Sequence, residues 1–217
     1  MLNKCVIIGD IIGSSRLSDW STIFNKINTT LKEVNEKFHD NIFINFNPTI
    51  GDEFQGALKN LQNAHHIYVF LQSKLPIMFR CGIGIGDIER MSTKNLGMRG
   101  TAFYRARSAL GLCEEEKRNI FIKLSDIPTE EEEEINTLLE IIEVLKNSWT
   151  NRQHQIINYY REHPDYTYEQ IAKYVRRISG KGSKQSVSQV LNAANWDIIS
   201  KGEVLINKLL KNISKAK

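Results

Sequence analysis

Two aspartates stand where a predicted strand gives way to a loop or a turn. Asp10 follows the apolar run of residues 2–8, and Asp52 lies in a predicted hairpin turn beside Gly51. Mg²⁺ in proteins is typically held by one or two carboxylates together with water and substrate phosphates. The Gly- and Ser-containing loop 11–15 offers backbone N–H groups to a phosphate. The pair therefore predicts a Mg²⁺ and phosphate site, although aspartates also favour strand ends and turns for structural reasons alone.

A regular order of strands and helices would position these aspartates. Apolar runs predict strands over 2–8, 42–46, 53–58, 77–85 and 119–124, and helical periodicity predicts helices over 20–38, 60–74 and 102–112. In a β-α-β-β-α-β order the first and third strands are neighbours, so Asp10 and Asp52 are expected to meet. We expect an α+β fold with a ferredoxin-like or palm-type sheet and its helices on one face.

Glycine alternates with isoleucine over residues 81–86. A dinucleotide-binding fingerprint opens a helix after a strand, whereas these glycines lie within a predicted strand, so the Rossmann interpretation is weak. Alternating glycines instead let a helix or a ligand approach one face of the sheet closely. Close packing of a helix is the favoured interpretation.

Residues 1 to about 125 resemble the SatD family of bacterial proteins, whose members carry segments similar to VIIGDIIGSS, TIGDEFQGAL, GIGIGDI and GMRGTAFYRARSAL in this order. The same segments are similar in spacing to the catalytic domain of class III nucleotidyl cyclases. This resemblance implies that Asp10 and Asp52 are ligands of Mg²⁺. It also implies that Ile11, Gly13 and Ser14 belong to a loop that cradles the phosphates of a nucleotide.

One stretch departs from the cyclase pattern. Active cyclases carry an Asn and an Arg in a pattern like G-x-x-V-N-x-A-x-R, but here Tyr104 takes the Asn position and Ser108 the Arg position. A cation aimed at transition-state charge is among the larger catalytic contributions. Arg105 and Arg107 are the alternative nucleotide-binding cations, although a shift of one residue turns a helical side chain by about 100°. We therefore expect nucleotide and metal binding with little cyclisation; an active cyclase or related phosphoryl-transfer enzyme is the alternative.

The C-terminal third carries most of the positive charge. Residues from Thr150 onward have a net charge of +7, and residues 1–149 have a net charge of −3. Capping-box patterns at Thr150 and Thr167 predict two helix starts, and a third helix is predicted from Ser183. A small basic module beside a mildly acidic one is typical of a polyanion-binding domain attached to another domain.

The predicted third helix presents side chains that read bases and phosphates. Its polar face carries Lys184, Gln185, Ser188, Gln189 and Asn192. Amide side chains such as Gln189 and Asn192 pair bidentately with adenine, and phosphates can be neutralised by Lys184, Arg176, Arg177 and Lys181. The segment is similar to the helix-turn-helix modules of bacterial regulators, which implies DNA as a partner. A three-helix bundle that binds proteins is the alternative.

These features divide the 217 residues into a cyclase-like domain (1–126), a linker helix (127–149) that can pair with a second subunit, and an all-α helix-turn-helix domain (150–217). The apolar runs are too short for a membrane helix, and no signal peptide is apparent, so a cytoplasmic location without a membrane partner is expected. The three cysteines are expected to be buried thiols. A DNA-binding regulator whose cyclase-like domain binds a nucleotide is the favoured function.

Overall fold

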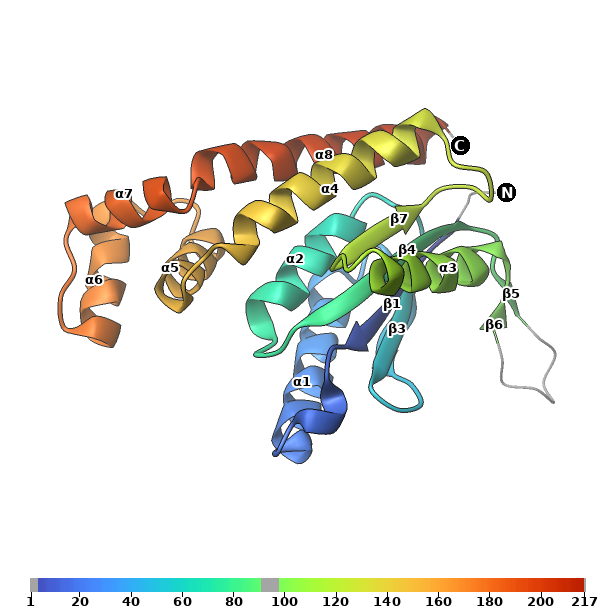
Figure 1. Ribbon diagram of the computed structural model, residues 1–217, viewed down its shortest axis with the longest axis horizontal. Helices are drawn as coiled ribbons and strands as arrows, with labels where there is room; N and C mark the ends of the chain where they lie inside the picture. Colours follow the sequence, from blue (N-terminus) through green and yellow to red (C-terminus); the bar gives the residue numbers. More distant parts are fainter. Residues whose placement is uncertain (1–3, 91–97, 217) are drawn as a thin grey trace. The chain divides into compact units, whose positions relative to one another are not determined.

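A five-stranded sheet is built from the first part of the chain in the computed structural model, which describes residues 4–90 and 98–216 (Figure 1). Its strands lie in the order β2-β3-β1-β4-β7 and are β1 (Lys4–Ile11), β2 (Ile42–Pro48), β3 (Glu53–Leu58), β4 (Phe79–Gly86) and β7 (Ile120–Lys123). β1 is antiparallel to its neighbours β3 and β4, and β4 is parallel to β7. The ferredoxin-type order is confirmed, and with it the contact between the first and third strands.

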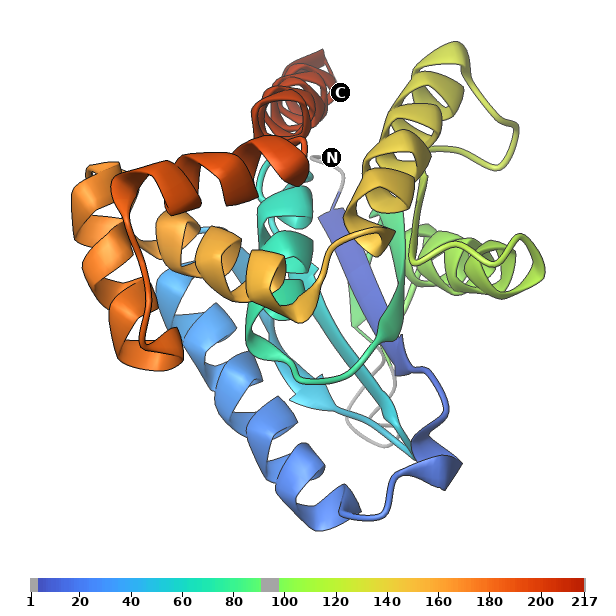
Figure 2. The same cartoon turned by 60° about the vertical axis from the view of Figure 1, so that its left-hand side comes forward.

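Helices cover both faces of this sheet, so the expectation of helices on one face is wrong. They are α1 (Trp20–Lys37), α2 (Ala64–Lys74) and α3 (Thr101–Glu115). A further helix, α4 (Glu130–Asn147), follows β7 in the chain. Figure 2 shows α1 and α2 on one side of the sheet and α3 on the other. On the first face Tyr68 of α2 meets Phe79, with 5.7 Å between ring centroids. A short antiparallel pair, β5 (Glu89–Arg90) and β6 (Met98–Arg99), precedes α3 and was not predicted.

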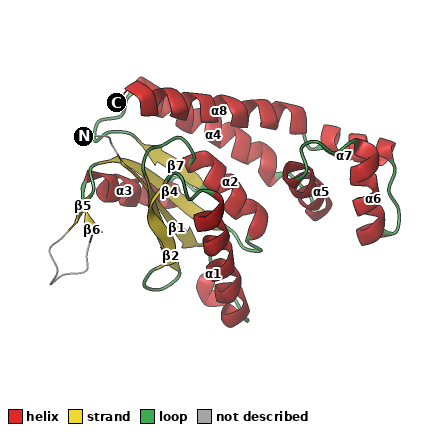
Figure 3. Ribbon diagram, turned by 180° about the vertical axis from the view of Figure 1, so that it is seen from behind, coloured by secondary structure: helices red, strands yellow, loops and turns green. Residues whose placement is uncertain are grey.

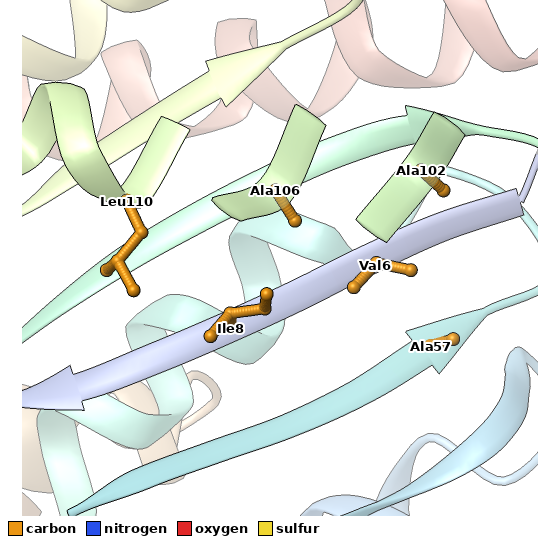
Figure 4. Close-up of a cluster of buried hydrophobic side chains, with 6 residues drawn as sticks. All are labelled: Val6, Ile8, Ala57, Ala102, Ala106 and Leu110. Carbon is orange, nitrogen blue, oxygen red and sulfur yellow. The ribbon is translucent and has the colours of Figure 1, made fainter. Parts of the chain in front are cut away.

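The alternating glycines of β4 explain why α3 lies on the opposite face. A Cβ placed on Gly84 would lie 2.2 Å from the backbone nitrogen of Ala106, and one on Gly82 would lie 2.3 Å from the Ala106 carbonyl oxygen. Small side chains on α3 complete the close approach, so that it packs against β1 and β3. Figure 4 shows this cluster of Val6, Ile8, Ala57, Ala102, Ala106 and Leu110. The prediction that these glycines admit a closely packed helix is confirmed.

Side chains of α4 close the outer edge of β7. The Asn136 amide accepts a hydrogen bond from the Ile122 N–H and donates one to the Ile122 carbonyl, both at 2.8 Å. The Glu132 carboxylate accepts from the backbone N–H groups of Leu124 at 2.6 Å and Ser125 at 3.2 Å. Both side chains are buried. They therefore supply the partners that a further strand would otherwise provide.

The chain separates into two units. Unit 1 comprises the chain up to Glu140 together with the chain from Ile206, and unit 2 comprises residues 141–205. Unit 2 contains α5 (Asn151–Glu162), α6 (Tyr168–Ser179) and α7 (Lys184–Ala193), whereas α8 (Trp196–Ala216) begins in unit 2 and ends in unit 1. Figure 3 shows that the strands belong to unit 1 and that unit 2 is helical.

Capping boxes begin the three short helices of unit 2. They pair Thr150 with Gln153, Thr167 with Gln170 and Ser183 with Ser186. The first two were predicted, and the third escaped prediction because a serine stands where Glu or Gln is usual. α5 ends at Glu162, two residues before Pro164, because the residue before a proline is disfavoured in a helix.

The buried thiols are confirmed, since the three cysteines are free and buried. Burial raises the pKa of the Cys113 thiol to about 12. Within the described residues, none of the helices is both long enough and apolar enough to cross a membrane.

Candidate functional site

Asp10 lies near the end of β1, between two charged residues of the neighbouring strands. The strand register places Glu53 of β3 and Arg80 of β4 directly opposite Asp10. An Arg80 Nη atom lies 3.3 Å from Asp10 Oδ2 and forms a partly buried ion pair. Because side chains alternate along a strand, Asp10 shares the α3 face of the sheet with Val6 and Ile8. The apolar row of β1 side chains on the α3 face therefore ends in a charged residue.

Asp52 lies in the turn between β2 and β3, close enough to Asp10 for its charge to raise the Asp10 pKa. Gly51 precedes it with a φ of 81°, so the predicted turn glycine is in the left-handed region. The Ser14 hydroxyl donates a hydrogen bond to an Asp52 carboxylate oxygen. Figure 2 shows the loop after β1 lying beside this turn. The loop and the turn thus form one connected edge of the site.

The loop that was predicted to cradle a phosphate is partly used by the fold. The backbone N–H of Ile11 donates to the Asp52 carbonyl at 3.3 Å, so it serves to hold the turn. Gly13 is exposed, with a φ of 70°, and it begins the 3-10 turn η1 (Ser14–Arg16). Ser14 is engaged with Asp52. Gly13 and Ser14 therefore lie at the surface of the site, whereas Ile11 is buried behind it.

Negative charge is concentrated around Asp10. Burial raises the pKa of the Asp10 carboxyl group, and the charges of Asp52 and then Glu53 raise it further, while the hydrogen bond from Arg80 opposes these effects. Burial and the neighbouring carboxylates make the ionised form of Asp10 costly, and a positive charge beside it would lower that cost. No group of three or more Asp, Glu, His or Cys side chains arranged to hold a metal is found within residues 4–90 and 98–216.

The two candidate arginines of α3 have different surroundings. Arg107 forms a bidentate ion pair with Glu53, with Nη–Oε distances of 2.5 and 2.8 Å. Arg105 instead pairs bidentately with Asp126, at 3.0 and 3.1 Å, and donates to the Ile85 carbonyl at 2.8 Å. Glu53 and then Asp10 raise the pKa of Arg107, so its positive charge lies within the field of the site. Arg107 therefore joins the aspartates, and Arg105 does not.

Sequence reasoning missed Glu53 and Arg80. The signal for Glu53 was present, because Glu53 and Ala57 are four residues apart on one strand and so share a face. Arg80 carried no local signal, since only the register between β1 and β4 brings it to Asp10. Tyr104 and Ser108 are exposed on α3.

The predicted DNA-contacting residues lie in unit 2. On α7, Lys184, Gln185, Gln189 and Asn192 are exposed, Ser188 is half-buried, and the opposite face buries Val187 and Leu191. Arg176 and Arg177 are exposed near the end of α6, and Lys181 is exposed in the turn that follows. Arg176 forms an exposed ion pair of 3.2 Å with Glu169. The polar face expected for α7 is therefore present at the surface.

Comparison with known proteins gives one family and distant structural likenesses. The model of the SatD family matches residues 4–202. The structure of a bacterial light-regulated adenylyl cyclase is similar at a TM-score of 0.40 and 13% identity, covering 57% of this chain and 76% of that chain. The adenylyl cyclase CyaB from P. aeruginosa is similar at a TM-score of 0.35 and 16% identity, with the same coverage of 57% and 76%. No curated protein matches the chain.

Proposed function

The chain belongs to the SatD family, and we propose that unit 1 binds a nucleoside phosphate together with a divalent cation held by Asp10 and Asp52. The observation that carries this proposal is the grouping of three carboxylates, Asp10, Asp52 and Glu53, at the end of β1 and the β2–β3 turn. Arg80 pairs with Asp10 and Arg107 pairs with Glu53 at this place. Carboxylates for a cation and guanidinium groups for phosphate oxygens are thus available within one site.

The residues fit Mg²⁺ better than a metal with a complete protein shell. Asp10 and Asp52 offer hard oxygen ligands, both side chains are half-buried, and Mg²⁺ takes its remaining ligands from water and phosphate oxygens. When bound, the cation would neutralise phosphate charge. Ser14 would keep Asp52 oriented, and Arg80 would do the same for Asp10. Arg107 would contact the phosphates as a bidentate donor.

Calorimetric titration with MgATP and MgGTP tests this proposal. Asp10→Asn and Asp52→Asn should each weaken binding about tenfold or more, because each removes a charged cation ligand, and tenfold corresponds to about 1.4 kcal/mol. Asp126→Asn is the matched control, since it removes an equal charge from a carboxylate that pairs with Arg105 and not with a residue of the site. Equal affinities in all four proteins would refute the cation site.

A phosphoryl-transfer activity is a second candidate, favoured by one observation. Arg107 places a cation in the field of Asp10, so the charge missing from the Ser108 position is supplied from one residue earlier on α3. If Arg107 takes over the role of the missing arginine, the protein with Mg²⁺ and ATP or GTP should make cyclic nucleotide. Arg107→Ala should then abolish turnover. If the native chain makes no more cyclic nucleotide than an Asp10→Ala control, nucleotide binding without turnover is the function proposed for unit 1.

For unit 2, we propose that α6 and α7 form a helix-turn-helix that binds duplex DNA. Support comes from the exposed Lys, Gln and Asn side chains of α7 and from the exposed basic groups that precede it. Fluorescence anisotropy of the full chain with a mixed-sequence duplex should show salt-dependent binding. Lys184→Ala should lower the salt slope by about one unit, because it removes one phosphate contact.

A contact to a base should behave differently from a contact to a phosphate. Gln189→Ala should cost roughly 1–3 kcal/mol on a duplex selected by the protein from a random pool, and little on a scrambled duplex. Absence of binding to any duplex at low salt would favour the alternative, a three-helix bundle that contacts proteins.

A further inference from the structure

The Arg107–Glu53 pair lies beside Asp10, and its bidentate geometry is the one with which arginine also binds phosphate ligands. Both Nη atoms of Arg107 meet both carboxylate oxygens of Glu53. The same fork-to-fork arrangement is how arginine binds phosphate. The Arg107 side chain is 53% exposed, so an anion from solution can reach it without moving the sheet or α3.

Arg105 shows what a structural arginine looks like on the same helix. Its side chain is 18% exposed, and it donates to two backbone carbonyls, of Ile85 and Leu124, in addition to the Asp126 carboxylate. Those carbonyls are fixed parts of the sheet and its exit loop, so Arg105 is tied to the fold. The contacts shown for Arg107 are both to one side chain, and a competing anion can replace them.

Glu53 is also placed to respond to a cation. It follows Asp52 in the chain and lies directly opposite Asp10 across the β1–β3 ladder. A divalent cation at Asp10 and Asp52 would attract the Glu53 carboxylate and repel the Arg107 guanidinium. Cation binding therefore weakens the Arg107–Glu53 pair and leaves Arg107 open to a phosphate.

Deepening the proposed function, on which this step rests, we propose that Glu53 is an internal place-holder for a ligand phosphate: it occupies Arg107 until a divalent cation and a polyphosphate bind together. The carboxylate neutralises Arg107 in the empty site and competes with free anions. The cation removes this competition. Anion affinity at Arg107 is thus coupled to cation occupancy by one side chain.

The test is calorimetric titration with inorganic tripolyphosphate, which has no base or sugar, in EDTA and in Mg²⁺. In EDTA, Glu53→Gln should bind tripolyphosphate about fivefold more tightly than the native chain, since a partly exposed competing ion pair has been removed. In Mg²⁺ this gain should disappear. Glu53→Ala should reproduce the result, and Arg107→Ala added to Glu53→Gln should cancel the gain.

Asp126→Asn is again the matched control. It removes one negative charge from the bidentate partner of Arg105, the other arginine of α3. A general effect of net charge would therefore raise tripolyphosphate affinity equally in Asp126→Asn and Glu53→Gln. That result overturns the place-holder, as does an affinity in EDTA that Glu53→Gln leaves unchanged or lowers. Thermal unfolding of each variant checks that the fold is retained.

The outcomes separate this inference from the proposed function. If MgATP binding depends on Asp10 and Asp52 but Glu53→Gln gives no gain in EDTA, the cation site stands and the place-holder falls. If Glu53→Gln gives the gain while MgATP binding is insensitive to Asp10 and Asp52, the anion subsite stands and the cation site falls.

Discussion

Two groups of charged side chains, one in each unit, differ in their charge balance and in their burial. The site cluster in unit 1 consists of Asp10, Asp52, Glu53, Arg80 and Arg107, and the buried cluster in unit 2 consists of Glu143, Lys146, Arg161 and Glu203. The buried cluster balances two acids against two bases, with Lys146 and Glu203 only 6% and 11% exposed and 2.9 Å apart. The site cluster has one acid more than its bases and is partly open.

This difference distinguishes charges that hold a fold from charges that await a ligand. In the buried cluster each ion has a partner that offsets its desolvation, and Arg161 also lies over the Trp196 ring at 4.8 Å. In the site cluster, burial and then the charges of Asp52 and Glu53 raise the pKa of Asp10. Burial without pairing would be too costly to tolerate, so the excess is found where solvent or a cation can reach it.

The largest expected effect comes from unbalancing the buried cluster. Glu203→Gln should lower the free energy of unfolding by about 3 kcal/mol, because Lys146 and Arg161 lose the carboxylate they share. Urea denaturation measures the change. Glu169→Gln, which breaks the exposed pair with Arg176 in the same unit, should cost less than about 0.5 kcal/mol. Equal losses would show that burial does not separate the two kinds of pair.

Replacing the two arginines of α3 sharpens the comparison within one helix. Arg105→Ala should destabilise unit 1 by about 2 kcal/mol, since it leaves two backbone carbonyls without this donor. Arg107→Ala should cost about 0.5 kcal/mol or less, because its pair with Glu53 is half-exposed. Denaturation midpoints of the two variants measure the ratio, and a larger loss for Arg107→Ala would assign it a structural role.

A smaller effect is expected from the pH dependence of Asp10. Its raised pKa in the folded chain means that the folded state binds this proton more readily than the unfolded state. The resulting stabilisation is complete below the unfolded pKa and is lost as pH rises through the folded value. The native chain should therefore gain stability relative to Asp10→Asn as pH falls from 7 toward 4. A stability difference that stays constant over this range would contradict the raised pKa.

The smallest effect should come from His154, which contacts the Trp149 ring in unit 2. Burial lowers its pKa below 6.5, and the charges of Arg161 and Lys146 lower it further. A lowered histidine pKa gives stability that is present above the unfolded value and is lost as pH falls. His154→Gln should flatten the stability profile between pH 7.5 and about 5.5. A steeper profile in the variant would reverse this assignment.

Predictions from the sequence succeeded where a pattern is local and failed where a contact is long-range. The order of strands and helices along the chain and the Thr150 and Thr167 capping boxes follow from patterns within short segments, and they are confirmed. The sequence named both Arg105 and Arg107 but could not separate them, because the pairing of Arg107 with Glu53 joins residues 54 positions apart. The prediction that all helices lie on one face of the sheet was wrong for α3. Glycine spacing indicates that a helix approaches closely, but it does not indicate on which face relative to the other helices.

Helix α8 escaped prediction for a related reason. Its buried positions include Ile199, Ile206 and Leu210, but Glu203 interrupts this apolar series. A charged residue at a core position weakens a helical hydrophobic pattern. Lys146 and Arg161, the partners of Glu203, lie far away in the chain. No local pattern in the sequence therefore indicates that the charge of Glu203 is neutralised.

The closed edge of β7 has a consequence for how the protein behaves at high concentration. A bare strand edge templates intermolecular pairing and, at the extreme, fibril growth. Asn136 prevents this at β7 by mimicking a strand partner with a single amide. At the other margin of the sheet, β2 is interrupted by register shifts and ends at Pro48. The two margins thus protect the sheet by different means, one by substitution of a partner and the other by irregularity, and neither offers a straight template for aggregation.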